Sequence, residues 1–208
     1  MAFTFFFRDY TVIEAAVKLL LAETMGRSRV RVWDAGCAMG PEPYTLLICL
    51  AENMGRFAFE NLRIDATDHD EGGDFGGIIE RGLYPAEQVS RLPAEILEKY
   101  FRPVDKSKTV YKVDSKLCDK LNFKRHDLLS LEPPGQGYSM IMCKNVLLHF
   151  SEEQRIKVIS MFHSALAPGG ILVMEHTQKL PYVFKGEFEQ ATSEAQIYTK
   201  LETAHVAA

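Results

Sequence analysis

Cysteines are few in this sequence, and it has no hydrophobic run long enough to cross a membrane. Its four cysteines are Cys37, Cys49, Cys118 and Cys143. They lie far apart and form no C-x-x-C pair, which argues against a zinc site or a dithiol redox motif. No apolar stretch approaches the roughly 18 residues that span a bilayer, and the segment 3–7, which is rich in Phe, lacks the flanking pattern of a secretory signal. We therefore expect a cytoplasmic protein with reduced thiols and no membrane insertion.

Composition and charge exclude further classes of protein. The 208 residues are 47% hydrophobic and 25% charged, which suits one globular domain over residues 1–208 and excludes a disordered chain. The formal net charge of −4 argues against a nucleic-acid partner for the molecule as a whole. Residues 99–125 differ, because they contain nine basic and three acidic residues. This basic stretch is either a solvated face or a docking surface for an acidic partner.

Helical and strand patterns alternate along the chain. Apolar residues at helical spacing predict helices over residues 11–25, 41–54, 93–100 and from Ser151 onward. Strand patterns occur over residues 30–33, 62–67, 117–124, 138–143, 171–174 and 196–200. Ser151 with Gln154 has the form of a capping box, and Pro168-Gly169-Gly170 is expected to stop the helix that Ser151 opens. Residues 70–77 hold four glycines, each costing about 1 kcal/mol in a helix, so we expect a frayed or looped segment there.

This alternation is typical of an α/β fold with a mostly parallel sheet, in which ligands bind outside the carboxyl ends of the strands. Gly36 and Gly40 follow the first strand, but the third glycine of a dinucleotide fingerprint is missing, which favours a ligand without phosphates. Asp68 follows the second strand, where an acid commonly holds ribose hydroxyls. By themselves, these residues fit a plain turn and a surface acid equally well.

Eight short motifs occur in one order along the chain. They are Thr4–Asp9, Trp33–Tyr44, Ala66–Asp68, Gly82–Tyr84, Lys99–Phe101, His126–Leu129, Cys143–Val146 and Leu166–Gly170. Together they resemble the CheR family, the S-adenosylmethionine-dependent methyltransferases that esterify glutamate side chains of chemotaxis receptors. The T-x-F-F-R start and the A-G-C-x-x-G-x-E-P-Y block are the specific parts of the match. The resemblance implies a Rossmann-like class I methyltransferase fold with an antiparallel last strand and a small antiparallel β-subdomain at residues 102–125.

The resemblance also implies S-adenosylmethionine as the cofactor, S-adenosylhomocysteine as its product, and a set of residues that bind them. Thr4 and Arg8 would close over the methionine end, where Arg8 offers a fork for a carboxylate. Gly36 and Gly40 would let the backbone approach this end, and Glu42 would lie beside it. Without the resemblance, Thr4 is equally a helix-entry residue, and Glu42 is equally a first-turn acid favoured by the helix dipole.

The remaining cofactor contacts would come from other strand ends. By resemblance, Asp68 would take the ribose hydroxyls, and Asp127 and Leu128 would border the adenine. Asn145 and Val146 would line the floor beside the sulfonium, although Asn145 is by itself also a common turn former.

Arg8, Asn145 and His149 are the candidate catalytic residues. The methyl acceptor that the resemblance implies is a glutamate side chain of another protein. With a reference pKa of about 4.3 it is ionised at neutral pH, so its attack on the methyl group needs no general base. Water exclusion and alignment of the reacting atoms then supply most of the acceleration, so no Ser-His-Asp or metal constellation is expected. The six histidines are scattered and lack the spacing of metal ligands.

Several features depart from the family pattern. Lys144 stands where the family has Arg, His149 where it has Tyr, and Asp127 where it has Asn. The family usually carries a helical domain before the T-x-F-F-R motif, and this chain begins almost at that motif, so a partner chain is a candidate to supply such a domain. The expected acceptor is an acidic protein such as a chemoreceptor signalling helix. Two alternatives stay open, namely a methyltransferase with another small-molecule or protein acceptor, and a non-catalytic S-adenosylmethionine-binding module.

Overall fold

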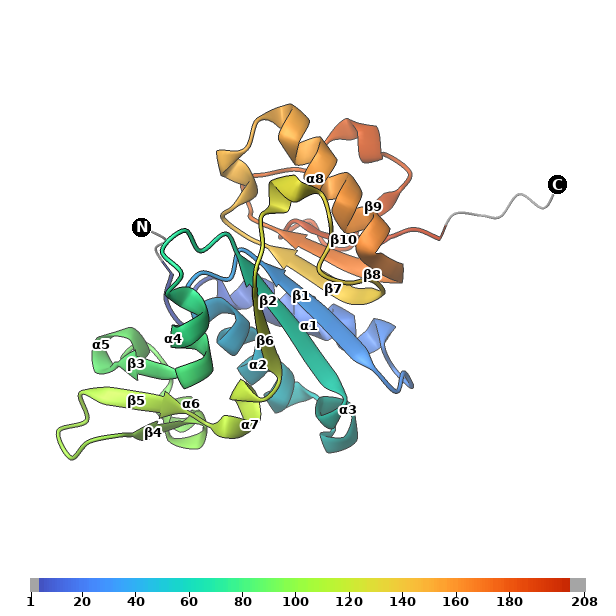
Figure 1. Cartoon of the computed structure of the whole chain (residues 1–208). Helices are drawn as coiled ribbons and strands as arrows, with labels where there is room; N and C mark the ends of the chain where they lie inside the picture. Colours follow the sequence, from blue (N-terminus) through green and yellow to red (C-terminus); the bar gives the residue numbers. More distant parts are fainter. Residues whose placement is uncertain (1–3, 203–208) are drawn as a thin grey trace.

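A seven-stranded sheet forms the centre of the computed structural model, which describes residues 4–202 (Figure 1). In spatial order its strands are β6 (Leu121–Arg125), β2 (Leu62–Asp68), β1 (Val30–Ala35), β7 (Tyr138–Cys143), β8 (Leu166–Met174), β10 (Ile197–Lys200) and β9 (Phe188–Gln190). The first five are parallel to one another, whereas β10 pairs antiparallel with β8 and β9. The expected α/β fold, with a mostly parallel sheet and an antiparallel last strand, is confirmed.

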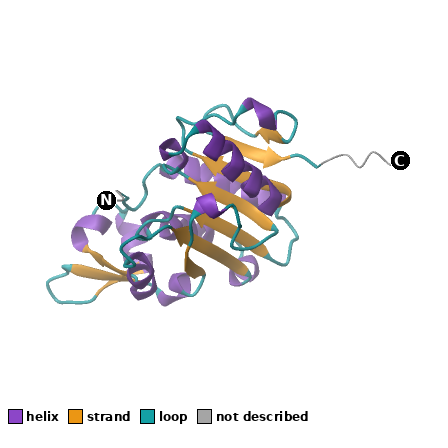
Figure 2. Ribbon diagram, turned by 45° about the horizontal axis from the view of Figure 1, so that its top comes forward, coloured by secondary structure: helices purple, strands orange, loops and turns teal. Residues whose placement is uncertain are grey.

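Helices cover both faces of this sheet (Figure 2). The α-helices are α1 (Tyr10–Glu23), α2 (Pro41–Asn53), α3 (Arg56–Glu60), α4 (Phe75–Arg81), α5 (Ala86–Val89), α6 (Ala94–Tyr100), α7 (Ser115–Cys118) and α8 (Glu152–Ala165). Short 3₁₀ turns are η1 (Leu128–Ser130), η2 (Leu147–His149) and η3 (Tyr182–Phe184). Helices α1 and α2 pack on one face of the sheet and α8 packs on the other. Within residues 4–202, no helix combines the length and the apolar character needed to cross a membrane.

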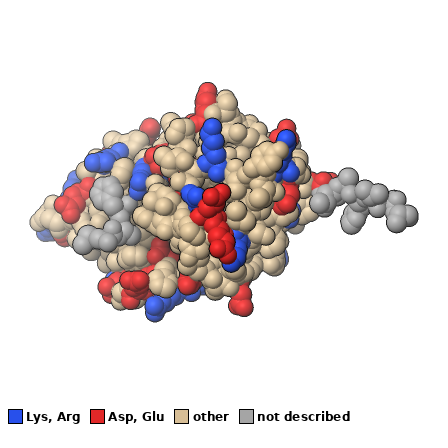
Figure 3. Space-filling view, turned by 90° about the horizontal axis from the view of Figure 1, so that it is seen from above, with Lys and Arg blue, Asp and Glu red and all other residues tan. Residues whose placement is uncertain are grey.

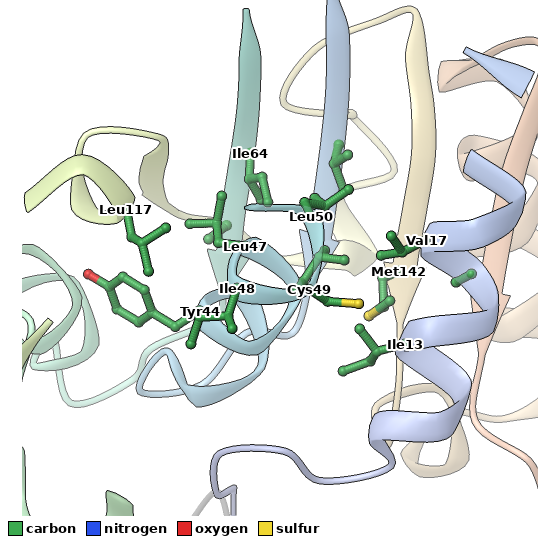
Figure 4. Close-up of a cluster of buried hydrophobic side chains, with 14 of the residues drawn as sticks. Ile13, Val17, Tyr44, Leu47, Ile48, Cys49, Leu50, Ile64, Leu117 and Met142 are labelled. Atoms are coloured by element: carbon green, nitrogen blue, oxygen red, sulfur yellow. The ribbon is translucent and has the colours of Figure 1, made fainter. Parts of the chain in front are cut away.

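Alternating side chains of the central strands enter two hydrophobic cores. Met140 and Met142 of β7 join α1 and α2 in the first core, part of which Figure 4 shows. Ile141 and Cys143 of the same strand join α8 in the second core. All four side chains are fully buried. A strand that is buried on both faces needs apolar residues on both, which explains why β7 is a nearly continuous apolar run.

A small antiparallel sheet lies between β2 and β6 in the sequence. Among the described residues its strands are, in spatial order, β3 (Leu83–Pro85), β5 (Val110–Val113) and β4 (Phe101–Pro103). These bounds differ from the expected 102–125, because β6 pairs parallel with β2 and so belongs to the main sheet. Leu117 is helical, in α7, where the Asp114 side chain accepts a hydrogen bond from the Lys116 backbone N–H. A period of two predicts a strand but does not indicate which sheet the strand joins.

The glycine-rich segment after β2 is only partly a loop. Residues 70–74 form the expected loop, but helix α4 follows at once and contains Gly76 and Gly77. A Cβ on Gly76 would lie 2.7 Å from the ring of Phe123. The glycine therefore permits α4 to pack closely on β6, and this packing outweighs the low helix propensity of glycine.

Helix α8 begins as expected and ends earlier than expected. Both hydrogen bonds of the capping box between Ser151 and Gln154 are present. The helix ends at Ala165, and Pro168-Gly169-Gly170 lies inside β8 instead of stopping the helix. A Cβ on Gly170 would lie 2.9 Å from the carbonyl oxygen of Tyr138, so this glycine serves the close pairing of β8 with β7.

Candidate functional site

Two adjoining cavities lie at the carboxyl ends of β1, β2 and β7. Their volumes are about 490 and 520 Å³, which is within the range of small-molecule sites. Gly36, Asp68, Val146 and His149 line both cavities, so the two meet along these residues. We call the first the apolar cavity, because Leu128 and Phe150 are among its other lining residues, and the second the charged cavity. This position is the expected one for a ligand of a parallel α/β sheet.

Nearly all of the predicted site residues line these cavities. The apolar cavity is also lined by Asp127 and Leu128. The charged cavity is also lined by Thr4, Arg8, Glu42 and Asn145. Gly40 lines neither cavity, in contrast to its expected place beside the methionine end. It has a φ of +101°, and a Cβ on it would lie 2.6 Å from Tyr84 Oη, so it instead lets the turn before α2 pack on β3.

A buried lysine connects two carboxylates at the charged cavity. Lys144 Nζ lies 3.3 Å from Glu42 Oε2 and 3.1 Å from Asp9 Oδ2, and the lysine side chain is only 2% exposed. Glu42 is held in the first turn of α2, which begins at Pro41. Burial raises the pKa of Glu42, and the positive charge of Lys144 opposes this shift. Lys144 is therefore a structural counter-ion whose position depends on three separate segments of the chain.

Arg8 and Asn145, two of the candidate catalytic residues, contact each other directly. Arg8 Nη2 donates a hydrogen bond to Asn145 Oδ1 over 3.1 Å. Asn145 has a φ of +59°, in the left-handed region, which aims the turn after β7 toward the cavity. The segment that carries Arg8 is held by a hydrogen bond from the Phe7 backbone N–H to Thr45 Oγ1 over 3.0 Å.

Gly36 allows the turn after β1 to approach the floor of both cavities. Its φ is +99°, and a Cβ at this position would lie 2.2 Å from Val146 Cγ2. Any side chain would therefore collide with Val146, which lines both cavities. The glycine is required here by conformation and by space.

The carboxylate of Asp68 is fixed at the junction of the two cavities. One oxygen accepts a hydrogen bond from the Ala38 backbone N–H over 2.9 Å, and the other accepts one from the Asp70 backbone N–H over 3.1 Å. Each carboxylate oxygen keeps a second acceptor site. The side chain can therefore accept hydrogen bonds from a diol while its own orientation stays fixed.

The far end of the apolar cavity is formed by the turn after β6. Asp127 Oδ1 accepts a hydrogen bond from the Leu129 backbone N–H over 2.8 Å and so caps η1. Leu128 is 7% exposed and presents its apolar surface to the cavity. Asp127 thus has a structural role in addition to its predicted place beside the adenine.

Asp34 is a buried acid to which the sequence assigned no role. It is the second-last residue of β1 and is fully buried. Burial and the negative charge of nearby Glu42 raise the pKa of Asp34 well above its ordinary range, against the effect of Lys144. The sequence does show an acid just before the glycine turn at Gly36, but it does not show that this acid is buried.

Glu175 is a second buried acid that the sequence did not single out. It follows β8 directly and is 4% exposed. Burial raises its pKa, while the backbone N–H groups of Asn145 and Leu148 favour the charged form. This carboxyl group therefore lies behind the turn that forms the cavity floor. Within residues 4–202 no cluster of three or more His, Cys, Asp or Glu side chains has the arrangement of a metal site.

Curated chemotaxis methyltransferases are similar to most of this chain. Chemotaxis protein methyltransferase 2 of Vibrio cholerae is 27% identical over 187 residues, which are 85% of this chain and 62% of that protein. The chemotaxis protein methyltransferase of Listeria innocua is 30% identical over 178 residues, which are 84% of this chain and 64% of that protein. The chain thus spans a little under two thirds of the length of these relatives.

A solved structure and a family model give two further comparisons. An O-methyltransferase family protein from Burkholderia thailandensis is 15% identical, with a TM-score of 0.46, and the match covers 94% of this chain and 47% of that one. Residues 2–197 match the family model described as the CheR methyltransferase, SAM binding domain. The expected family and its cofactor, S-adenosylmethionine, are confirmed by this match, and the chain belongs to the CheR methyltransferase SAM-binding domain family.

Proposed function

We propose that this chain is an S-adenosylmethionine-dependent methyltransferase that esterifies glutamate side chains of a protein of the chemoreceptor type. The observation that carries the proposal is the pairing of an apolar cavity with a charged one across Gly36 and Asp68. A cofactor with a purine at one end and a zwitterionic amino acid at the other has the same division of character.

The residues of the two cavities fit this cofactor. Leu128 and Val146 offer apolar surface for the purine, and Asp68 offers acceptors for the ribose hydroxyls. Glu42 would accept from the α-ammonium, and Arg8 would hold the α-carboxylate. When bound, the cofactor supplies an electrophilic methyl group on a positively charged sulfur. The turn from Lys144 to His149 would form the floor beneath that sulfur.

The contribution of the chain to the reaction is mainly positioning and exclusion of water. A glutamate acceptor is already ionised at neutral pH, so it needs no base. Lys144 is engaged by Glu42 and Asp9, which makes it a positioning residue and not a proton carrier. Arg8 and Asn145 fix each other by a hydrogen bond at the charged cavity. Such fixed side chains lower the entropic cost of aligning the acceptor carboxylate in line with the methyl group. His149 is exposed and lines both cavities, which places it on the acceptor side.

The basic stretch of residues 99–125 gives only limited support for an acidic partner. Several of its charges are paired with acids outside the stretch: Lys99 with Glu52, Lys120 with Glu60, and Lys124 with Asp65. The face shown in Figure 3 carries interspersed positive and negative side chains. The proposal therefore rests on the apolar and charged cavities and not on a basic docking surface. A cytoplasmic location is part of the same proposal.

Methyl transfer from tritiated S-adenosylmethionine to bacterial membranes rich in chemoreceptors tests this function. The expected result is protein-bound label that alkali releases as methanol, the behaviour of a carboxyl methyl ester. Asp68→Asn should lower the rate at subsaturating cofactor by about tenfold or more, because one charge-assisted acceptor is lost. Glu95→Gln, a change at an exposed acid of α6, should leave the rate unaltered.

Two results would contradict the proposal. Label found only in small molecules of a cell lysate would indicate a methyltransferase with a different acceptor. Tight cofactor binding by calorimetry, without label in any fraction, would indicate a binding module.

A further inference from the structure

A third cavity lies at the amino ends of β1 and β2, at the opposite ends of these strands from the cofactor site. Its volume is about 340 Å³, and it is lined by Arg29, Arg31, Asn61 and Arg63. We call it the arginine pocket. Arg31 and Arg63 occupy paired positions of the two parallel strands. Arg29 directly precedes β1, and Asn61 directly precedes β2. The six residues of β1 separate this pocket from the turn at Gly36, a distance of roughly 20 Å for an extended strand.

One of the three guanidinium groups is neutralised by the fold. Arg31 Nη2 lies 3.0 Å from Asp65 Oδ2, and Arg31 Nη1 donates to the Gln136 carbonyl over 2.8 Å. The guanidinium carbon also lies 4.8 Å from the centre of the Tyr138 ring. Arg31 is therefore a fixed wall of the pocket and keeps few free donors.

The other two guanidinium groups form no ion pair with a carboxylate in the described part of the chain. Arg63 Nη1 donates to the backbone carbonyls of Glu60 and Leu62 over 3.0 and 2.6 Å, contacts that leave its charge uncompensated. Arg29 is exposed and has no hydrogen-bond or ion-pair partner within residues 4–202. Two positive charges thus face one cavity.

The acids near this pocket are engaged elsewhere. Asp65 interacts with Arg31 and with Lys124, whose Nζ lies 3.7 Å from Asp65 Oδ1. Asp65 also accepts a hydrogen bond from Tyr138 Oη over 2.7 Å. The carboxylate of Glu60 lies 3.5 Å from Lys120 Nζ. Neither Asp65 nor Glu60 forms an ion pair with Arg29 or Arg63.

We propose that the arginine pocket binds a small phosphorylated anion that carries at least two negative charges, such as a diphosphate. Guanidinium groups match phosphate oxygens with two parallel hydrogen bonds. The Nδ2 of Asn61 donates one hydrogen to the Phe57 carbonyl over 3.0 Å and keeps a second as an uncharged donor. The volume is at the lower end of the range for small-molecule sites, which fits a compact ligand.

Isothermal titration of the full chain with inorganic pyrophosphate at low ionic strength tests the proposal. We expect saturable binding that weakens as salt is added. The Arg29→Gln and Arg63→Gln variants should each bind about tenfold more weakly or worse, and the double variant should show no measurable heat. Saturating S-adenosylhomocysteine should leave the affinity for pyrophosphate unchanged, because the two sites lie at opposite ends of β1. Acetate, with one charge, should bind far more weakly than pyrophosphate.

The matched control is the double variant Lys106→Gln and Lys108→Gln, which removes two exposed positive charges from the loop between β4 and β5. It should bind pyrophosphate as the unmodified chain does. Circular dichroism of each arginine variant checks that its fold is retained, and the two single variants provide independent readings. The proposal is overturned if pyrophosphate does not bind, if the lysine variant loses as much affinity as the arginine variant, or if S-adenosylhomocysteine displaces pyrophosphate.

Discussion

Replacing Lys144 with methionine keeps the length of the side chain and removes its charge from the charged cavity. The lysine is 2% exposed, and its Nζ lies 3.3 Å from Glu42 Oε2. Removal of one partner from a buried ion pair costs about 3–5 kcal/mol, because the other charge is left without compensation. The second partner, Asp9, is 47% exposed, and its share of the interaction is therefore small. We expect a loss of about 3 kcal/mol in the free energy of unfolding, at the lower end of that range.

This loss should depend on pH in a defined direction. Burial already raises the pKa of Glu42, and Lys144 opposes the shift. Without Lys144 the pKa of Glu42 in the folded state rises further above its value in the unfolded chain, so the folded variant binds a proton more readily. The stability of the variant is then retained below the ordinary carboxyl pKa of about 4.3, and it falls as pH rises through the raised pKa of the folded state. Lys144→Met should therefore be milder at about pH 5 than at about pH 8.

Urea unfolding at these two pH values measures the effect. Lys99→Met is the matched control, because Lys99 Nζ lies 2.7 Å from Glu52 Oε1 but its side chain is 58% exposed; its loss should stay below about 1 kcal/mol. Addition of Glu42→Gln to Lys144→Met removes the uncompensated charge and should restore part of the stability. A Lys144→Met variant that loses no more than Lys99→Met at the higher pH, or that loses the same amount at both pH values, would refute the reasoning.

Two further predictions concern the turn after β1 and the first core. Gly36→Ala should abolish measurable binding of S-adenosylhomocysteine in a calorimetric titration, because its Cβ would lie 2.2 Å from Val146 Cγ2. Gly26→Ala has a comparable φ of +79° with no atom within 4 Å, so it should retain binding, and equal binding by both variants would exclude the steric argument. Leu47→Ala empties a fully buried position (Figure 4) and should lower the free energy of unfolding by about 2–5 kcal/mol. Met25→Ala, at a side chain that is 84% exposed, should change it by less than about 0.5 kcal/mol in the same urea titration.

Local patterns in the sequence predict the parts of the fold that local interactions determine. The capping box of α8 requires two residues three positions apart, and both of its hydrogen bonds form. The apolar run of β7 predicts a strand that is covered on both faces, and its side chains do enter both cores. The bounds of the small sheet could not be predicted in this way, because β6 is assigned to the main sheet by pairing with β2. In that pair Asn122 donates to Asp65, which is 57 positions away in the chain.

The candidate site likewise combines features that local motifs predict with features that depend on contacts between distant residues. The motifs around Gly36, Asp68 and Asn145 direct attention to the residues that line the cavities. They give no role to Asp34, and they mark Lys144 only as a departure from a pattern. The importance of both residues comes from burial and from contact with Glu42, which is 102 positions away from Lys144. No local periodicity reports such a contact, so electrostatic roles of buried residues have to be obtained from the structure.

The small antiparallel sheet contributes to the charged cavity although no residue of its strands lines either cavity. Phe6 is fully buried, and its ring makes edge-to-face contacts with Tyr84 of β3 and Phe101 of β4 at 4.9 and 5.3 Å. Aromatic pairs of this geometry stabilise by about 0.5–1.5 kcal/mol each beyond the area they bury. They hold the segment in which Arg8 reaches Asn145, which is 137 positions away. The main sheet therefore positions the turn that carries Asn145, and the small antiparallel sheet positions the segment that carries Arg8. The charged cavity forms only when both sheets are folded.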